Sequence, residues 1–321
     1  MHQGYDLIGD IHGCGKTLIK LLKQMGYKKK SGVYQHKSRK AIFLGDIVDR
    51  GPNIRLACQT VYDMVEQGHA YIIMGNHEYN LVTYCTPAPG DFDRPFLREH
   101  TERNNFIVQE TINQFANHSE DFQQYLNWFA DLPLFLDFDH FRTIHACWDQ
   151  NLIDQYVQRY GGNQLPRRYL AESVDTSSFL YQFLDRSLRG TSLELPEGRS
   201  IESRDGMIRR FFRAKFWEKN PQVYQDVVFQ PDPLPEDLQQ RQLSAEEQNK
   251  LVYYSDQEKP LFLGHYWMWG VPATITPNIA CLDYSAVKYG RLVAYRMDRE
   301  HSLSNTKFTW VSVEKEERAK R

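Results

Sequence analysis

The sequence predicts an α/β fold, and three observations support this. Residues 5 to 85 alternate short apolar runs, typical of buried strands, with segments of helical periodicity. Each apolar run ends at a glycine followed by polar side chains. The chain has 321 residues, 41% of them apolar and 25% charged, as expected for one large globular domain. We therefore expect a single domain over residues 1–313 and a charged tail over 314–321.

Three strand ends carry polar residues of the same kinds. The apolar runs 5–8, 41–44 and 70–74 lead into Gly9-Asp10-Ile11-His12-Gly13, Gly45-Asp46-Ile47-Val48-Asp49-Arg50-Gly51 and Gly75-Asn76-His77-Glu78. Open α/β sheets bind ligands at the carboxyl ends of their strands. Carboxylates there can hold cations, and an arginine can clamp phosphate oxygens. One such loop could be a surface turn with an incidental ion pair, but core packing does not explain three.

The segments between these strands are predicted to be helical. Leu18, Leu21, Leu22 and Met25 form an apolar stripe over residues 15–25, and a second helix is expected over about 53–66. Gly13-Cys14-Gly15-Lys16-Thr17 resembles the end of a P-loop, but the required earlier glycine is Asp10. Lys16-Thr17 is therefore interpreted as the start of the first helix, and residues 28–32 as a solvated turn.

The middle of the chain is predicted in less detail. Residues 86–119 are polar and suggest a loop with a short helical excursion, followed by a helix over 122–130. Residues 132–138 and 141–145 form a predicted hairpin that places His145 at a strand end. Residues 205–219 are interpreted as an amphipathic helix, and 231–249 as a surface loop with a short helix. The tail over 314–321 is expected to fray.

Composition excludes several classes of function. The formal net charge of −2 gives no general basic field for nucleic acid or an anionic membrane. No apolar run is long enough to span a bilayer, and the first strand leaves no room for a signal peptide. Five cysteines without a C-x-x-C pair favour reduced thiols and a cytoplasmic protein. Cys14 and Cys147 are expected to be buried and apolar rather than redox-active.

The motif order GD-x-HG, GD-x-VDRG and GNHE resembles the calcineurin-type metallophosphoesterases. The VDRG and GNHE forms resemble the branch of phosphoprotein phosphatases and symmetrical dinucleoside tetraphosphatases. Two later histidines fit the same pattern, in Thr143-Ile144-His145-Ala146-Cys147 and Leu263-Gly264-His265, as do the closing segments 278–283 and 290–294. The resemblance implies a sandwich of two mixed β-sheets flanked by helices. It also implies a largely helical insertion, over about 150–255, within the 119 residues between His145 and His265.

The resemblance also implies roles for individual residues. Two divalent or trivalent metal ions would be bound, by Asp10 and His12 at the first position, Asp46 at both, and Asn76, His145 and His265 at the second. The absence of thiolates from this set favours manganese, with iron or zinc as alternatives. His77 would be the general acid, with Asp49 holding its charged form. Arg50 and Asn76 would contact substrate, with Arg213 as a further phosphate-binding candidate, and Glu78 would be structural.

The predicted function is hydrolysis of phosphate esters or anhydrides by a metal-bridged hydroxide. Tyr266, Trp267 and Trp269 follow His265 and could stack on a nucleobase, which favours nucleotide or dinucleoside polyphosphate substrates. A serine/threonine protein phosphatase acting on phosphoproteins is the first alternative, and a catalytically silent metal-binding scaffold the second. The presence of Asp10, Asp46, Asp49, Arg50 and His77 disfavours the silent scaffold. The family usually has His-Ala-Gly and Gly-His-Thr where this chain has His145-Ala146-Cys147 and Gly264-His265-Tyr266, so we expect an altered pocket wall.

Overall fold

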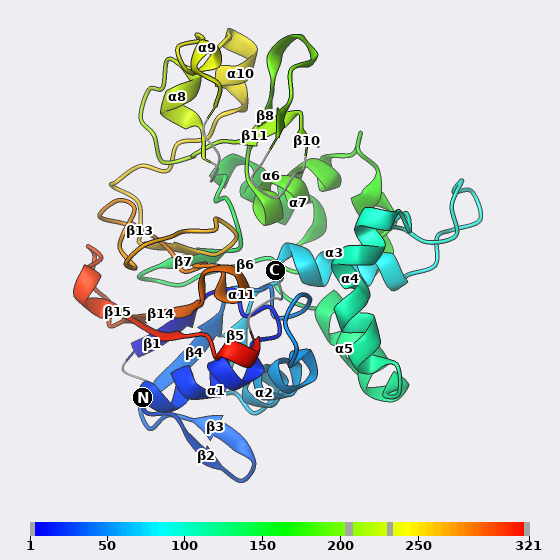
Figure 1. Cartoon of the computed structure of the whole chain (residues 1–321), viewed down its shortest axis with the longest axis vertical. Helices are drawn as coiled ribbons and strands as arrows, with labels where there is room; N and C mark the ends of the chain where they lie inside the picture. The colour runs from blue at the N-terminus through cyan, green and yellow to red at the C-terminus, as the bar shows by residue number, and fades with distance from the viewer. Residues whose placement is uncertain (1–3, 203–207, 230–233, 318–321) are drawn as a thin grey trace.

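Two β-sheets stacked face to face form the centre of the molecule (Figure 1). The computed structural model describes residues 4–202, 208–229 and 234–317. The first sheet has the strand order β15-β14-β1-β4-β5, formed by Phe308–Ser312, Arg291–Met297, Gly4–Ile8, Arg39–Phe43 and Ala70–Ile72. The second has the order β13-β12-β7-β6, formed by Ile279–Cys281, Leu261–Leu263, Arg142–Ile144 and Phe135–Asp137.

Both sheets are mixed, as predicted. Strands β1, β4 and β5 are parallel, whereas β14 runs antiparallel to β1 and β15 antiparallel to β14. In the second sheet β7, β12 and β13 are parallel, and β6 pairs antiparallel with β7 in the predicted hairpin. The carboxyl ends of the parallel strands therefore lie at one edge of each sheet.

An apolar layer fills the space between the sheets. Leu7, Ile42, Phe262, Ala280 and Val293 point into it from both sides and are fully buried. Because side chains alternate along a strand, Ile8 and Phe43 point to the opposite face and pack under the helices. The sheets are held together by apolar burial from both inner faces.

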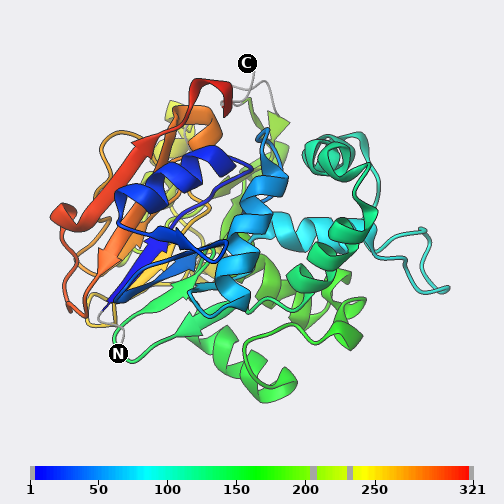
Figure 2. The same ribbon diagram turned by 90° about the horizontal axis from the view of Figure 1, so that it is seen from below.

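Helices cover the two outer faces (Figure 2). Helices α1 (Gly15–Gln24) and α2 (Ile54–Glu66) pack on the first sheet, close to their predicted bounds. Helices α6 (Gln150–Tyr160) and α7 (Phe179–Arg189) pack outside the second sheet. Beside the sheets lie α3 (Asn76–Cys85), α4 (Glu102–Phe115) and α5 (Ser119–Ala130) (Figure 1). Helix α4 has 14 residues, so the prediction of only a short helical excursion was wrong.

The turn predicted at residues 28–32 is part of a β-hairpin that also includes residues 33–35. Strands β2 (Lys28–Lys30) and β3 (Val33–Gln35) form a hairpin, although the three lysines are exposed as expected.

Several further helical elements are only three or four residues long. They are α11 (Ala286–Tyr289), η1 (Arg167–Tyr169), η2 (Glu172–Val174), η3 (Pro196–Gly198), η4 (Asn305–Lys307) and η5 (Lys315–Glu317).

The predicted amphipathic helix over 205–219 was wrong. Residues 203–207 lie outside the described chain, and the next residues form β10 (Ile208–Arg209) and β11 (Phe211–Arg213), which pair with β9 (Ile201–Glu202) and β8 (Ser192–Glu194). Phe211 is half exposed whereas Phe212 is buried, so burial here alternates with the period of a strand. The short helices that follow are α8 (Tyr224–Val227), α9 (Glu236–Gln239) and α10 (Ala245–Lys250).

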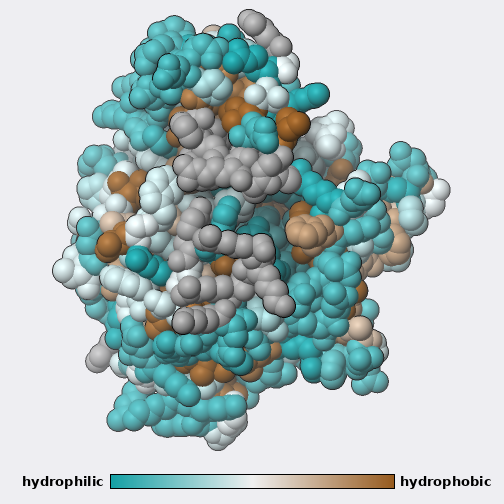
Figure 3. All heavy atoms as spheres, in the orientation of Figure 1, coloured by the Kyte–Doolittle hydropathy of each residue, from teal (hydrophilic) through white to brown (hydrophobic). Residues whose placement is uncertain are grey.

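This part of the insertion has a small core of its own. Leu193, Phe212, Tyr224, Val227 and Leu243 pack together, apart from the two clusters of the main sandwich. In Figure 1 these elements lie beyond the second sheet. The face shown in Figure 3 is mostly hydrophilic. No helix among the described residues is both long and apolar enough to span a membrane.

Glu317 shows that the charged tail is not frayed up to that residue. It is fully buried, and its carboxylate accepts the backbone N–H groups of Lys16 and Thr17, both at 2.8 Å, and the Thr17 hydroxyl. The Asn53 side-chain amide, next to the start of α2, donates to the same carboxylate at 2.9 Å. The amides beside the P-loop-like glycine therefore bind an anion, and that anion is a side chain of the protein itself.

Glu317→Ala is expected to lower the free energy of unfolding by about 1–3 kcal/mol, because buried donors lose their acceptor. Urea unfolding followed by circular dichroism measures this. Glu316→Ala is the matched control, since Glu316 is 64% exposed and pairs with the Lys16 ammonium at the surface. Equal unfolding midpoints for the two variants would contradict the prediction.

Candidate metal centre

Five strand ends supply the predicted metal-binding side chains. Asp10 and His12 follow β1, Asp46 follows β4, and Asn76 follows β5. The second sheet adds His145 directly after β7 and His265 after β12. All six are buried, and the sandwich brings together residues up to 255 positions apart in the sequence, as for Asp10 and His265.

The backbone of these loops is strained. His12, Asp46, Asp49, Arg50 and His265 have φ angles between 43° and 69°, a region that side chains other than glycine rarely adopt. The Asp46 carbonyl accepts the N–H groups of Ile11 at 3.0 Å and His12 at 2.8 Å, which locks the first two loops together. Strain of this kind persists only where the surroundings enforce it, and it is concentrated at functional sites.

Two glycines permit the close approach of the loops. A Cβ atom on Gly264 would lie 2.1 Å from Asp10 Oδ1, and one on Gly75 would lie 2.3 Å from Asp46 Oδ1. No side chain fits at either position, so glycine is required for the carboxylates to reach their places.

Asp46 is shared by two groups of possible metal ligands. One group consists of His12, Asp46 and His77, and the other of Asp46, His145 and His265. Asp46 Oδ2 lies 3.6 Å from His12 Nε2 and 3.4 Å from His145 Nε2. The two imidazoles are oriented by their Nδ1 atoms, which donate to the carbonyls of Val48 at 3.0 Å and Leu44 at 2.6 Å. The Nε2 atoms are thereby turned towards Asp46.

Asn76 and Asp10 complete the arrangement. Asn76 Oδ1 lies 3.1 Å from His145 Nε2 and 2.8 Å from His265 Nδ1. Asp10 Oδ2 accepts the N–H of His265 at 3.2 Å. Asp10 Oδ1 and His265 Nε2 are buried and have no hydrogen-bond partner among the described residues. Buried polar atoms without partners are costly, and a cation between these ligand atoms would remove that cost.

The electrostatics also suit bound cations. Burial acts to raise the pKa of Asp46, but the neighbouring His145 outweighs it and the pKa is well below its usual value. Against the lowering effect of burial, Asp46 in turn raises the pKa of His145 to about 10, so the two side chains form a buried ion pair that a cation would replace. Burial and the nearby Asp283 raise the pKa of Asp10. Burial, with Arg213, lowers the pKa of His265, leaving the neutral imidazole that metals require. The donor set therefore fits metal ions.

Asp49 and Arg50 hold His77 in place, and its Nε2 atom lies 4.0 Å from Asp46 Oδ2. Its Nδ1 atom lies 2.5 Å from Asp49 Oδ2, and its Nε2 atom lies 3.3 Å from Arg50 Nη2. Asp49 is held in turn by Thr111 of α4, whose hydroxyl contacts Asp49 Oδ1 and accepts the Asp49 N–H at 3.0 Å. Because the guanidinium can only donate, His77 Nε2 accepts from it, and Nδ1 carries the proton shared with Asp49.

Glu78 is structural, as predicted. Its carboxylate accepts the backbone N–H groups of Asp46 at 2.7 Å, Ile47 at 2.8 Å, Val48 at 3.3 Å and Gly75 at 3.0 Å. Burial, and then repulsion from Asp46, raises the pKa of Glu78 to about 7. It therefore ties the loop after β4 to the start of α3.

A sequence model of the calcineurin-like phosphoesterases matches residues 6–186. This is more than half of the chain and includes the three loops and His145. The chain belongs to the calcineurin-like phosphoesterase family.

Curated relatives in this family are named as tetraphosphatases. The bis(5'-nucleosyl)-tetraphosphatase PrpE (asymmetrical) of Oceanobacillus iheyensis is 48% identical over 157 residues, which cover 48% of this chain and 60% of that protein. The enzyme of the same name from Halalkalibacterium halodurans is 30% identical over 158 residues, 48% of this chain and 61% of that protein. The match thus covers about three fifths of the length of these relatives. Their names specify asymmetrical enzymes, whereas the motifs resembled the branch that includes symmetrical ones.

A solved structure supports the fold along nearly the whole chain. The cold-active protein-tyrosine phosphatase of a psychrophilic Shewanella species superposes with a TM-score of 0.52 at 16% identity. The superposition covers 98% of this chain and 81% of that one. The two proteins therefore share a fold that extends beyond the segment matched by the family model.

In this calcineurin-like phosphoesterase Arg213 lies in β11, not on the predicted helix. Its guanidinium donates to the His265 carbonyl at 3.0 Å and lies 5.3 Å from the centre of the Tyr266 ring. It contributes to the cavity that contains the metal-site residues. The insertion therefore reaches back to the loop after β12.

Tyr266 does not face that cavity. Its side chain is fully buried, with ring centres of Trp217 and Phe229 at 5.4 Å and 5.1 Å. The expectation that Tyr266 stacks on a nucleobase is therefore corrected. The next residue, Trp267, does line the cavity, and the Arg50 guanidinium lies 5.4 Å from its ring centre.

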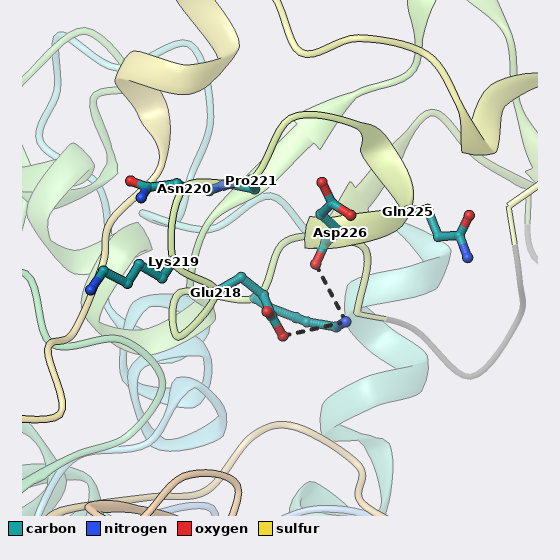
Figure 4. Close-up of a pocket in the computed structure, with 7 residues that line it drawn as sticks. Glu218, Lys219, Asn220, Pro221, Gln225 and Asp226 are labelled. Carbon is teal, nitrogen blue, oxygen red and sulfur yellow. Dashed lines mark hydrogen bonds and ion pairs between the residues drawn. The ribbon is translucent and has the colours of Figure 1, made fainter.

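The cavity has a volume of about 1050 Å³ and is rich in arginine. Its base includes Asp46, Asn76, His77 and His265. Eight arginines contribute to its walls: Arg50, Arg94, Arg98, Arg103, Arg189, Arg209, Arg210 and Arg213. A second hollow, of about 460 Å³, lies in the insertion between Lys215 and Asp226 and includes none of the metal-site residues (Figure 4).

Sequence reasoning missed two residues of this calcineurin-like site. Asp283 is buried behind Asp10; its Oδ1 accepts the Ser285 N–H at 2.7 Å, and burial raises its pKa to about 6. It follows the apolar strand β13, so the strand-end pattern that found Asp46 could also have found Asp283. Thr111 carried no such signal, because its role depends on how α4 packs.

The cysteines give no sign of redox chemistry. All five are free, and burial raises the pKa of Cys147 to about 12. Burial raises the pKa of Cys14 as well. Protonated, buried thiols of this kind are unreactive.

Asp46→Asn is expected to reduce the metal content of protein dialysed against Mn²⁺ from two ions per chain to one or fewer, because one carboxylate serves both ligand groups. Elemental analysis of the purified protein measures this. Asp121→Asn is the control, since Asp121 is 50% exposed and pairs with Arg55. A wild-type protein that retains no metal, or a variant that retains both ions, would contradict the prediction.

Proposed function

We propose that the chain is a metal-dependent phosphoesterase acting on nucleotide or dinucleoside polyphosphates. One observation supports this proposal above all: two groups of possible metal ligands share Asp46, and members of both line an arginine-rich cavity. A phosphorylated small molecule suits a cavity of about 1050 Å³. The names of the tetraphosphatase relatives favour the same class of substrate.

Asp10, His12 and Asp46 would hold one metal ion, and Asp46, Asn76, His145 and His265 the other. When bound, such ions polarise phosphoryl oxygens and lower the pKa of water. The protein contributes ligands that are held in place before the metal arrives, because carbonyls, Glu78 and glycine contacts fix each loop.

Arg50 and Arg213 would bind the phosphate group under attack. Both belong to the cavity, and each guanidinium offers a planar set of donors that matches phosphate oxygens. In this structure, the Arg50 guanidinium donates to His77 Nε2. A phosphate that takes over these donors would leave His77 Nε2 free to carry a proton.

His77 would then deliver that proton to the departing oxygen. Asp49 accepts from Nδ1 and stabilises the charged imidazole that forms before transfer. Thr111 keeps the Asp49 carboxylate oriented for this purpose. Trp267, at the wall of the cavity beside Arg50, would stack on a nucleobase.

His77→Asn is expected to lower turnover roughly 10²–10⁴-fold while metal content remains close to that of the wild type. The loss should be greater for an alkyl phosphate than for p-nitrophenyl phosphate, whose leaving group needs less protonation. Exposed His301→Asn is the control. Loss of bound metal in His77→Asn would instead assign His77 as a ligand, a role its proximity to His12 and Asp46 would allow.

The substrate class is tested by comparing diadenosine tetraphosphate, ATP, p-nitrophenyl phosphate and phosphopeptides with Mn²⁺ present. We expect the highest kcat/KM for diadenosine tetraphosphate. Trp267→Ala should raise its KM about 5- to 150-fold, the effect of losing about 1–3 kcal/mol of stacking. Trp269→Ala is the control, since Trp269 is 60% exposed and outside the cavity.

Two outcomes would replace this proposal. Higher kcat/KM for phosphopeptides would make the chain a protein phosphatase. Binding of two metals with no turnover of any substrate would make it a metal-binding scaffold.

A further inference from the structure

Three arginines of the cavity, all outside the metal-binding loops, are neighbours of one another. Arg98 precedes α4, Arg103 lies in the first turn of α4, and Arg189 ends α7. Three carboxylates contribute to the cavity, against eight guanidiniums. The chain as a whole has a formal charge of −2, so this positive charge is a local feature.

Arg98 is the most unusual of these arginines. Its side chain is partly buried, and no hydrogen bond or ion pair joins its guanidinium to any residue that the structure describes. Burial and the neighbouring Arg189 lower its pKa to about 10. Arg103 and the phenols of Tyr79 and Tyr181 are among its other neighbours. A desolvated cation without an anion is costly, and a bound anion would remove the cost.

Arg189 is held rigidly beside it. Its guanidinium donates to Asp185 Oδ1 at 2.9 Å and to Asn80 Oδ1 at 2.8 Å, and lies 5.9 Å from the centre of the Tyr79 ring. Asp185 is 41% exposed and neutralises one of the three guanidiniums. The group therefore keeps a net positive charge, and the entropic cost of binding an anion is lowered at Arg189, which is already held in place.

We propose that Arg98, Arg103 and Arg189 form a second phosphate subsite, which binds a phosphate group other than the one being hydrolysed. The inference rests on the proposed function and narrows it to substrates with a chain of two or more phosphates. Such a chain would run from the metal ions to this subsite within one cavity. Guanidinium groups match phosphate oxygens in shape as well as in charge.

Calorimetric titration of metal-depleted protein with inorganic tripolyphosphate and with orthophosphate tests the subsite without relying on turnover. We expect tripolyphosphate to bind at least tenfold more tightly than orthophosphate. Arg98→Met should weaken tripolyphosphate binding about tenfold or more, as loss of a charge-assisted hydrogen bond implies. Arg98→Lys should retain part of the affinity, because it keeps the charge.

Two further variants guard against misfolding and nonspecific charge effects. Arg103→Met changes an exposed residue and should weaken tripolyphosphate binding without disturbing the fold. Arg55→Met, on α2 outside the cavity, should leave binding unchanged. If Arg98→Met and Arg103→Met both keep the wild-type affinity, or if Arg55→Met loses as much, the subsite is wrong.

A parallel titration with diadenosine tetraphosphate identifies what the arginines contact. Equal losses for this ligand and for tripolyphosphate would support a subsite for the phosphate chain, whereas losses confined to the nucleotide would overturn it. The two proposals can fail separately. If the protein hydrolyses no substrate but its tripolyphosphate binding depends on Arg98, the proposed enzyme is rejected and the subsite is kept. If the protein hydrolyses its substrate but Arg98→Met binds tripolyphosphate as the wild type does, the subsite is rejected and the enzyme is kept.

Discussion

The carboxylate of Glu78 is the interaction on which the site depends. It accepts four backbone N–H groups, three from the turn after β4 and one from Gly75 after β5. Without an acceptor these buried donors could not be satisfied, and the turn could not hold Asp46 at φ 52°. The same turn places Asp46 Oδ1 to accept the His77 N–H at 2.9 Å. Glu78 thus sets the positions of Asp46 and His77, the residues proposed as the shared ligand and the proton donor.

The parts of the site that could be predicted from sequence share one physical origin. A buried parallel strand must be apolar, and the turn at its end is marked by glycine and polar residues. Each loop could therefore be recognised separately, which identified Asp10, Asp46 and Asn76 as site residues. Asp283 follows the same rule and could have been recognised. The helices over 15–24 and 54–66 were predictable from the spacing of their apolar residues, whereas the two-sheet sandwich was expected only from the resemblance to the calcineurin-type family.

The errors arose where tertiary contacts decide the local structure. Residues 208–213 have an apolar spacing compatible with a helix, but pairing with β8 and β9 makes them strands. Tyr266 is adjacent to a ligand in sequence, yet Trp217 and Phe229 enclose its ring, so sequence proximity to His265 did not give access to the cavity. Arg98 belongs to no recognisable motif. Its proposed role rests on its burial beside Arg189, which only the folded chain brings about.

Glu317 also constrains the order in which the protein can assemble. Its partners at Lys16 and Thr17 lie 301 and 300 residues earlier in the chain, directly after the loop that carries Asp10 and His12. During synthesis those residues leave the ribosome long before Glu317 is made. Until Glu317 has been synthesised and has packed against α1, the amides of Lys16 and Thr17 lack this acceptor and must be hydrated. The start of α1, although made early, therefore gains its anion only when the end of the described chain is in place.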